Sequence, residues 1–209
     1  VVYGLPRDTG TRALLYNKTE LDRAGMTLGD EVTWEEFKEA AALLTQDTDG
    51  DGVTDKFGFG YAGGNTWALL HEALATFAIQ TGEDIFTAAG KPNVNCEGMK
   101  KAVELMKELE EMGACPKDSV TTTDANLVTE MFLAGTVGMI QSNLGGYRNI
   151  MNKNPEFEVG MALLKDSTVG SSLGGWTLAV SQKAEDPEAC FKVLEYLCQP
   201  ENIVLFTSS

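Results

Sequence analysis

The stretch Thr33–Gly60 constrains the fold more than any other part of the chain, because it predicts a helix, an acidic turn and a strand in direct succession. Thr33, followed three residues later by Glu36, is the pattern of a capping box, which marks a helix start. Apolar residues then recur at helical spacing, at Trp34, Phe37, Ala41 and Leu44. The acidic turn DTDGDG leads into KFGFG, which is typical of a strand.

Hydrophobic spacing predicts alternating strands and helices along the rest of the chain. Strands are expected at Val1–Leu5, Arg12–Asn17, Val137–Ile140, Val159–Leu163 and Gly174–Ser181. Helices are expected at Trp67–Gln80, Cys96–Met112 and Asn149–Asn154, with a last one beginning at Asp186 and Pro187. Pro6 and a turn at Asp8–Gly10 are expected to end the first strand. This alternation predicts an α/β fold.

The charge of the chain limits the classes of partner. Its 209 residues include 31 acidic and 16 basic ones, which gives a net charge of −15. Nucleic acids and anionic membranes need basic surfaces, so neither is expected as a partner. No apolar run reaches the roughly 18 residues that a membrane-spanning helix needs. The chain begins Val1-Val2-Tyr3, without a methionine or a signal-peptide pattern, so we expect it to be a piece of a longer protein.

The four cysteines, Cys96, Cys115, Cys190 and Cys198, show no C-x-x-C spacing. The last two are eight residues apart on one predicted helix, which separates them by about 12 Å, too far for a disulfide bond. We therefore expect free, partly buried thiols, and cysteine usage does not decide the redox compartment.

The acidic loop from Asp47 to Asp55 matches the first nine positions of a calcium-binding EF-hand loop. The expected ligands are carboxylate oxygens and one backbone carbonyl, from Asp47, Asp49, Asp51, Val53 (the carbonyl) and Asp55. Gly52 stands where the sharp turn needs a glycine, but Gly58 occupies the twelfth position, where an EF-hand has a bidentate glutamate. Two interpretations stay open, a structural Ca²⁺ site and an acidic turn without metal. No cofactor is expected to be required, and no catalytic metal is expected.

Enzyme signatures are largely absent from the sequence. It contains no G-x-S-x-G, H-E-x-x-H or P-loop motif. The single histidine, His71, lies in an apolar predicted helix and is expected to pack there. The adjacent carboxylates Glu110 and Glu111 lie on a solvated helix face, so they do not form an acid/base pair. The sequence therefore favours a non-catalytic function, with a carbohydrate-active enzyme as a weaker alternative.

Three segments share a pattern suited to ligand binding. Each places small or amide residues beside one aromatic residue at the end of a predicted strand, with the following members: Asn65 and Trp67; Ser142, Asn143 and Tyr147; Gly175 and Trp176. Aromatic rings stack on apolar C–H faces, and amides supply paired donors and acceptors, which suits a neutral polyol such as a sugar. Strand ends are also the usual ligand positions in open α/β sheets. The alternative for each aromatic taken alone is packing in the core.

Four segments, taken in this order, resemble the extracellular solute-binding proteins of ABC importers, and most closely the members that bind maltose and oligosaccharides. They are YGLPRDTGTRALLYNKTELDRAGM, TWEEFKEAAALLTQDTDGDGVTDKFGFG, FLAGTVGMIQSNLGGY and GGWTLAVSQKAEDPEACFKVLEYLCQPE. The resemblance implies two α/β lobes with mixed sheets, joined by hinge crossings, with the ligand held between them. Residues 1–175 would form the second lobe with the first crossing, and residues 176–209 the return strand and a helix that belongs with the first lobe.

The resemblance also implies a function and a site. The protein would bind a carbohydrate outside the cell, as a monomeric periplasmic protein or surface lipoprotein, and deliver it to an ABC transporter permease. Trp67, Tyr147 and Trp176 would stack on the sugar, and Asn65, Ser142 and Asn143 would hydrogen-bond to it. Arg7 and Asp8 would line the crossing beside Gly175. The other hypothesis is a calcium-stabilised interaction module built on the acidic loop.

Overall fold

The computed structural model describes residues 4–208 and divides the chain into two compact units. The larger unit is Thr11–Ser172, and the smaller unit combines Val1–Gly10 with Leu173–Ser209. Each unit is described here by itself. The division into lobe residues 1–175 and 176–209 stays a prediction.

A five-stranded mixed sheet forms the centre of the larger unit, in the order β3-β6-β2-β5-β4. Strand β2 runs antiparallel to both β5 and β6, whereas β3 is parallel to β6 and β4 is parallel to β5. The strands are β2 (Ala13–Asn17), β3 (Glu31–Thr33), β4 (Phe57–Gly60), β5 (Val137–Ser142) and β6 (Val159–Lys165). The predicted α/β class is therefore confirmed.

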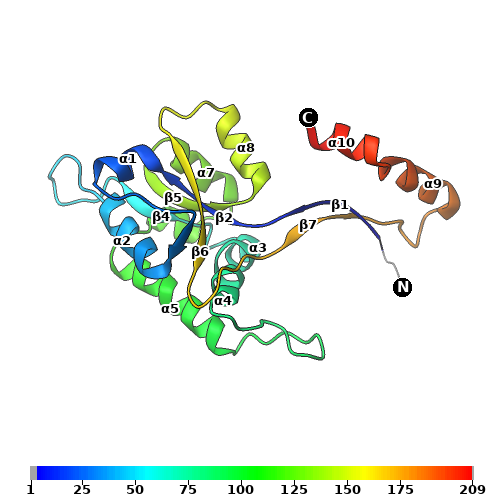
Figure 1. Cartoon of the computed structure of the whole chain (residues 1–209), viewed down its shortest axis with the longest axis horizontal. Helices are drawn as coiled ribbons and strands as arrows, with labels where there is room; N and C mark the ends of the chain where they lie inside the picture. The colour runs from blue at the N-terminus through cyan, green and yellow to red at the C-terminus, as the bar shows by residue number, and fades with distance from the viewer. Residues whose placement is uncertain (1–3, 209) are drawn as a thin grey trace. The chain divides into compact units, whose positions relative to one another are not determined.

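Helices cover both faces of this sheet (Figure 1). Successive residues of a strand point to opposite faces, so Leu14 and Tyr16 belong to one hydrophobic core and Leu15 to the other. The first core is closed by α1 (Lys18–Arg23), α2 (Trp34–Leu44), α4 (Ala75–Gln80) and α5 (Glu97–Glu111). The second is closed by α7 (Ala125–Leu133) and α8 (Leu144–Asn152). A short helix, α6 (Lys117–Thr121), precedes α7.

Helix α8 begins five residues earlier than the sequence predicts. Asn143 has extended backbone angles, and its side chain accepts a hydrogen bond from the amide of Gly146, so it caps the helix. Gly145 and Gly146, which read as a loop, thus lie inside the first helical turn. A Cβ at Gly146 would overlap the Ser142 hydroxyl, so the glycine is needed for close packing and not as a helix breaker.

Close backbone approach also explains the glycine in β4. A Cβ on Gly58 would overlap the backbone of Ala41 in α2. The glycine lets the helix lie directly on the strand, and the Phe37 and Phe59 rings then meet edge to face at 5.1 Å. The FGFG pattern therefore serves packing between helix and strand.

The smaller unit contains a two-stranded antiparallel ribbon and two helices. Strand β1 (Leu5–Gly10) pairs with β7 (Gly174–Leu178). The prediction that Pro6 ends the first strand is wrong, because an edge strand tolerates a proline, and the ladder shifts register between Pro6 and Asp8. Residues 1–3 of that predicted strand lie outside the described part of the chain.

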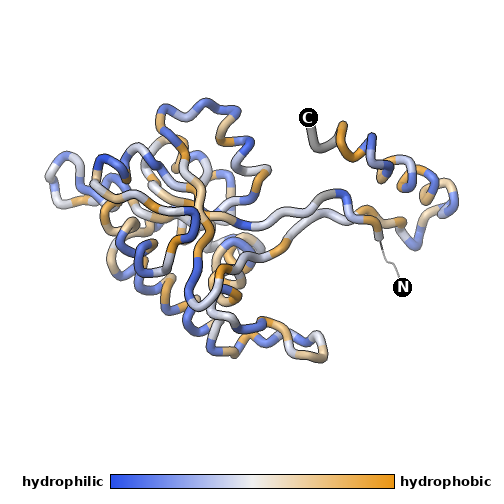
Figure 2. The backbone as a smooth tube through the Cα atoms, viewed as in Figure 1, coloured by the Kyte–Doolittle hydropathy of each residue, from blue (hydrophilic) through white to orange (hydrophobic). Residues whose placement is uncertain are grey.

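Helices α9 (Pro187–Leu197) and α10 (Pro200–Ser208) complete the smaller unit. Hydrophobic and hydrophilic residues are interspersed along α9 (Figure 2), whereas the sequence of α10 contains an apolar run, IVLF. None of the helices in the described part of the chain is both long and apolar enough to cross a membrane. Cys96, Cys115, Cys190 and Cys198 are free thiols, as predicted.

Candidate functional site

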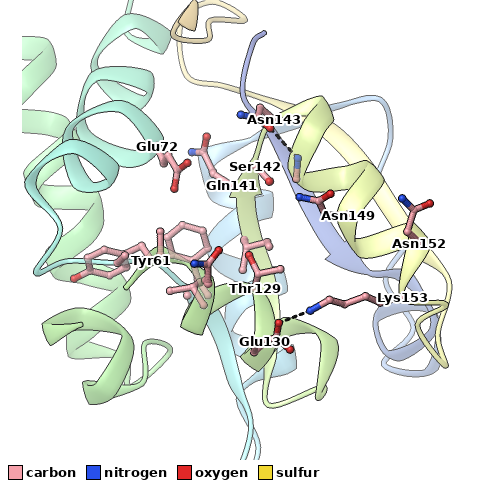
Figure 3. A pocket seen from close by; sticks show the side chains of 18 residues that line it. Tyr61, Glu72, Thr129, Glu130, Gln141, Ser142, Asn143, Asn149, Asn152 and Lys153 are labelled. Atoms are coloured by element: carbon pink, nitrogen blue, oxygen red, sulfur yellow. Dashed lines mark hydrogen bonds and ion pairs between the residues drawn. The ribbon is translucent and has the colours of Figure 1, made fainter. Parts of the chain in front are cut away.

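A cavity of about 490 Å³ opens in the larger unit where β4 and β5 end, beside α7 and α8 (Figure 3). Its volume is within the range of ligand-binding pockets, about 300–1,000 Å³. Amide and hydroxyl side chains dominate its polar lining, which consists of Asn126, Thr129, Gln141, Ser142, Asn143, Asn149 and Asn152, with Glu72, Glu130 and Lys153 as the charged members. Such a lining offers many hydrogen-bond donors and acceptors with little net charge.

The end of β5 positions the polar side chains at one end of the cavity. Gln141 and Ser142 are its last two residues, and Asn143 follows as the cap of α8. Gln141 is only 7% exposed, yet its Nε2 has no hydrogen-bond partner among the described residues. A buried amide donor without a partner is costly, so this group is free to receive a ligand acceptor.

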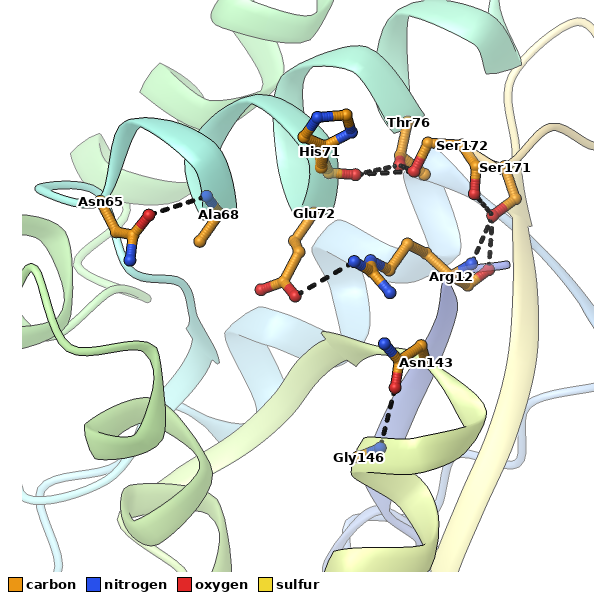
Figure 4. A network of polar contacts seen from close by, with 10 residues as sticks. All are labelled: Arg12, Asn65, Ala68, His71, Glu72, Thr76, Asn143, Gly146, Ser171 and Ser172. Atoms are coloured by element: carbon orange, nitrogen blue, oxygen red, sulfur yellow. Dashed lines mark hydrogen bonds and ion pairs between the residues drawn. The ribbon is translucent and has the colours of Figure 1, made fainter. Parts of the chain in front are cut away.

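A cluster of Arg12, Trp67 and Glu72, which we call the Arg12 cluster, adjoins this end of the cavity through Glu72, which lines it. Figure 4 shows Arg12 and Glu72 of this cluster. Arg12 is only 5% exposed, and its Cζ lies 5.6 Å from the centre of the Trp67 ring, a cation–π distance. Its Nη2 lies 3.6 Å from Oε1 of Glu72, which is an ion pair too long for a hydrogen bond. The Nε of Arg12 has no partner among the described residues.

A widened helix segment places Glu72 in this cluster. Asn65 caps α3 (Thr66–Ala68), which continues through a π-helical segment, η1 (Leu69–Leu74), into α4. The amide of Ala75 donates to the carbonyl of Leu70, five residues back, as a π-helix requires. The carbonyl of His71, left over by this spacing, accepts hydrogen bonds from the hydroxyls of Thr76 and Ser172, both at 2.8 Å.

The chain around Ser171 holds the backbone of Arg12 in place. The amide of Arg12 donates to the Ser171 hydroxyl at 2.6 Å, and that hydroxyl donates to the Arg12 carbonyl at 2.8 Å. Burial raises the pKa of the Glu72 carboxyl, and the Arg12 guanidinium partly offsets this by lowering it. The cluster therefore contains a partly buried acid and base of opposite charge, fixed by neighbouring segments.

The predicted site residues of the larger unit fall into two groups. Ser142 and Asn143 line the cavity, and Trp67 lies 57% exposed over Arg12. Asn65 is occupied as a helix cap, and its amide nitrogen also donates to the Thr123 carbonyl. Tyr147 is partly buried and packs against the core under α7 and α8. The structure thus brings three of the five predicted residues to the cavity and the Arg12 cluster.

The remaining predicted site residues belong to the smaller unit. Gly175 and Trp176 lie in β7, and the Arg7 guanidinium lies 5.7 Å from the centre of the Trp176 ring. Trp176 is 69% exposed. Asp8 is opposite Trp176 in the strand ladder, but its side chain is outside what the structure describes.

Sequence reasoning missed Arg12, Glu72 and Gln141. Each carries a weak signal: Arg12 stands directly before the apolar run ALLYN, Glu72 is the single charged residue of the helix Trp67–Gln80, and Gln141 follows the buried run VGMI. A charged or amide residue at the edge of an apolar run is expected to be held near the core. His71 is partly exposed, and its ring packs at 5.1 Å from that of Trp67, in keeping with the predicted packing role.

The acidic loop lies apart from this site, between α2 and β4. Carboxylate oxygens of Asp47, Asp49 and Asp55 lie within 4.8 Å of one another, all on exposed residues. Asp51 is not in that group, and its carboxylate accepts a hydrogen bond from the amide of Val53. Amide donors from Gly52 and Gly50 hold the pKa of Asp47 below its usual range. Three of the expected ligands therefore converge, and calcium binding stays a prediction.

Comparison with known proteins places the whole chain in one group. A family model described as bacterial extracellular solute-binding protein matches residues 1–207. A protein of Brucella abortus assigned as a binding protein is 26% identical over 210 residues, which cover 99% of this chain and 49% of that protein.

Solved structures share the fold. An ABC transporter solute-binding protein of Thermotoga lettingae, with bound α-D-tagatose, gives a TM-score of 0.82 at 24% identity and covers 99% of this chain and 52% of its own. MalE3 of T. maritima, with bound maltose, gives 0.78 at 21% identity, covering 97% of this chain and 52% of its own. This chain therefore spans about half the length of the relatives it matches.

Proposed function

Because the chain belongs to the family of bacterial extracellular solute-binding proteins, we propose that it captures a neutral carbohydrate outside the cell for delivery to an ABC transporter, without catalysing a reaction. The two solved relatives carry a sugar, tagatose in one and maltose in the other, which supports a carbohydrate as the ligand. A periplasmic or surface-anchored location and a transporter permease as partner are parts of the same proposal.

This proposal is supported mainly by the exposed ring of Trp67, which lies next to buried polar groups. Trp67 is 57% exposed and contacts Arg12, whose ion-pair partner Glu72 lines the amide-lined cavity. A sugar ring has an apolar C–H face and a rim of hydroxyls, so it can stack on Trp67 while its hydroxyls reach the amides. Ser142 and Asn143 would contribute hydrogen bonds from the cavity wall.

The other predicted contacts keep defined places in this proposal. Trp176 and Arg7 would offer a second stacking surface from the smaller unit, with Gly175 leaving room beside the ring. Tyr147 would contact the ligand only at its exposed edge, because much of the side chain packs on the core. Closure of two lobes around the ligand would then stabilise the bound state, since contacts from both sides favour the closed conformation.

Isothermal titration calorimetry of the chain with a sugar panel tests this function. The panel contains D-glucose, D-galactose, D-tagatose, D-mannitol, maltose and maltotriose. At least one neutral member is expected to bind, and Trp67→Ala is expected to weaken that binding by about tenfold or more, because a stacked ring is lost.

The matched control is Phe86→Ala, which removes an aromatic side chain that is also about half exposed but lies outside the cavity. Its affinity is expected to equal that of the wild type. Sugars recovered unchanged after long incubation would agree with a non-catalytic role. Failure of every panel member to bind, or equal binding by Trp67→Ala, would contradict the proposed function or its site respectively.

A further inference from the structure

We propose that Glu72, Arg12 and Gln141 form a subsite that binds two adjacent hydroxyl groups of a neutral sugar and discriminates against sugar acids. This inference rests on the proposed carbohydrate capture and specifies which chemistry of the ligand is recognised. It concerns residues that no resemblance singled out, and it depends on the contacts they make and lack.

The first step is the free acceptor capacity of Glu72. Its carboxylate lines the cavity, and among the described residues its polar contact is the 3.6 Å ion pair with Arg12. No hydrogen bond to either oxygen is found in residues 4–208 of the chain. A carboxylate accepts up to four hydrogen bonds, and those from hydroxyl donors to a charged acceptor are about twice as strong as neutral ones. Glu72 can therefore accept from two neighbouring hydroxyls at once.

The second step is a pair of donors that lack partners. Arg12 Nε and Gln141 Nε2 are the buried side-chain donors without a hydrogen bond in the part of the chain that is described, and both residues are more than nine-tenths buried. An unpaired buried donor is destabilising, so a ligand acceptor that satisfies it is favoured. Figure 3 shows Gln141 and Glu72 at the same end of the cavity, and Figure 4 shows Arg12 reaching Glu72. A hydroxyl that donates to Glu72 has lone pairs left for these donors.

The third step is the charge balance of the subsite. The Arg12 guanidinium neutralises Glu72, so the pair carries no net charge for a ligand to compensate. A sugar acid would bring its carboxylate beside that of Glu72, and two like charges at such a distance disfavour each other. The net charge of −15 on the chain adds to the repulsion at long range. Arg12 thus supplies a donor and balances the charge, and Glu72 determines specificity.

The test measures the affinities of neutral sugars and their matched acids, D-glucose with D-glucuronate and D-galactose with D-galacturonate, together with the bound members of the sugar panel. The wild type is expected to favour the neutral member by at least tenfold. Glu72→Gln keeps the shape but loses charge-assisted acceptors, so neutral sugars are expected to bind about tenfold more weakly, and the preference over the acids is expected to shrink.

The matched control is a glutamate that also forms an ion pair, with a lysine, but lies outside the cavity. Glu130 lines the same cavity and is therefore not a suitable site for a control; Glu158 lies outside it, and its carboxylate is engaged by Lys18 at 3.0 Å, so the control used is Glu158→Gln, which is expected to leave both affinities unaltered. Because Glu72→Gln leaves Arg12 without its counter-charge, the double variant Arg12→Gln, Glu72→Gln is measured beside it. Recovery of wild-type affinity and selectivity by the double variant would overturn the proposal, since it would show that Glu72 is not a ligand acceptor.

The outcomes distinguish failure of the Glu72 subsite from failure of the proposed carbohydrate binding. Binding of a neutral sugar that is unchanged in Glu72→Gln overturns the subsite and leaves carbohydrate capture standing. Absence of binding by the wild type contradicts the proposed function itself. Stronger binding of D-glucuronate or D-galacturonate than of the neutral partner by the wild type would also overturn the subsite, because it would identify the cavity as a site for acids.

Discussion

Helices α5 and α9 have similar amphipathic sequences and very different surroundings. Helix α5 buries Gly98, Met99, Ala102, Leu105, Met106 and Leu109 against the larger unit, whereas α9 has no buried residue. On α9 the apolar side chains of Phe191 and Val193 are both more than half exposed. Hydrophobic periodicity therefore predicts that a helix forms and which of its faces is apolar. It does not show which other element, if any, packs against that face.

The largest expected difference in stability comes from replacing one buried phenylalanine of the larger unit and one exposed phenylalanine of α9. Phe37 is fully buried, with its ring near those of Phe59 and Phe77. Phe37→Ala is expected to lower the free energy of unfolding by about 3–5 kcal/mol. Phe191→Ala, at a side chain that is 56% exposed, is expected to change it by less than about 0.5 kcal/mol.

Urea unfolding followed by circular dichroism measures both variants. Equal losses would show that α9 packs as firmly as α2, and the comparison between the two regions would then break down. If Phe37→Ala lowers the free energy of unfolding by less than about 1 kcal/mol, the neighbouring core side chains must fill the space left by the Phe37 ring.

Loss of helix caps is expected to have an intermediate effect. The Thr33 hydroxyl accepts from the Glu36 amide and the Glu36 carboxylate accepts from the Thr33 amide, so both halves of the capping box form. Thr33→Ala is expected to cost about 1 kcal/mol of the free energy of unfolding. Asp186 caps α9 through the Ala189 amide at 3.0 Å, and the same change there is expected to lower only the helical signal, because α9 has no buried residue.

Thermal melts at 222 nm follow both changes. If Asp186→Ala lowers the melting temperature of the larger unit as much as Thr33→Ala does, the terminal helices are part of one cooperative structure. Each cap accepts a hydrogen bond from the amide three residues on, through a hydroxyl at Thr33 and through a carboxylate at Asp186. Since the carboxylate makes the stronger bond, a smaller effect of Asp186→Ala on the melting temperature would report on packing.

The smallest expected effect is calcium binding by the acidic loop. The loop lacks a bidentate glutamate, so a dissociation constant near the millimolar range is expected. At a calcium concentration equal to that constant, stabilisation is about 0.4 kcal/mol, or a rise of about 1–2 °C in the melting temperature of the larger unit. Asp49→Asn should abolish the rise, whereas Asp186→Asn should retain it. An equal rise in Asp49→Asn would show that calcium acts elsewhere.

Much of the fold follows from the sequence because its elements carry local signals. Helix α2 begins at the predicted capping box, and β2, β5 and β6 lie within one or two residues of the predicted strands. Strand β3 escaped prediction, since three residues are too few to show a period, and its pairing with β6 comes from residues more than a hundred positions away. Pro6 was misread because only the ladder shows that β1 is an edge strand.

The candidate site is less predictable than the fold. Trp67, Ser142 and Asn143 could be found because strand ends and aromatic residues next to amides have sequence signatures. Arg12 and Glu72 could not, since their ion pair joins residues sixty positions apart and depends on the π-helical geometry of η1. Long-range charge pairing leaves no mark in the spacing of a single sequence.

Segment η1 has a consequence for how this site can change in evolution. A regular α-helix turns about 100° with each residue, so the directions of all its side chains are locked to one another. The wide π-helical turn between Leu69 and Leu74 changes the angle between the side chains before it and those after it. Trp67 can therefore face outward while Phe77 stays in the core. Substitutions can alter the chemistry of either side independently. Changing the angle between the side chains before η1 and those after it requires an insertion or deletion. The geometry of the site should therefore be inherited more faithfully than its ligand preference.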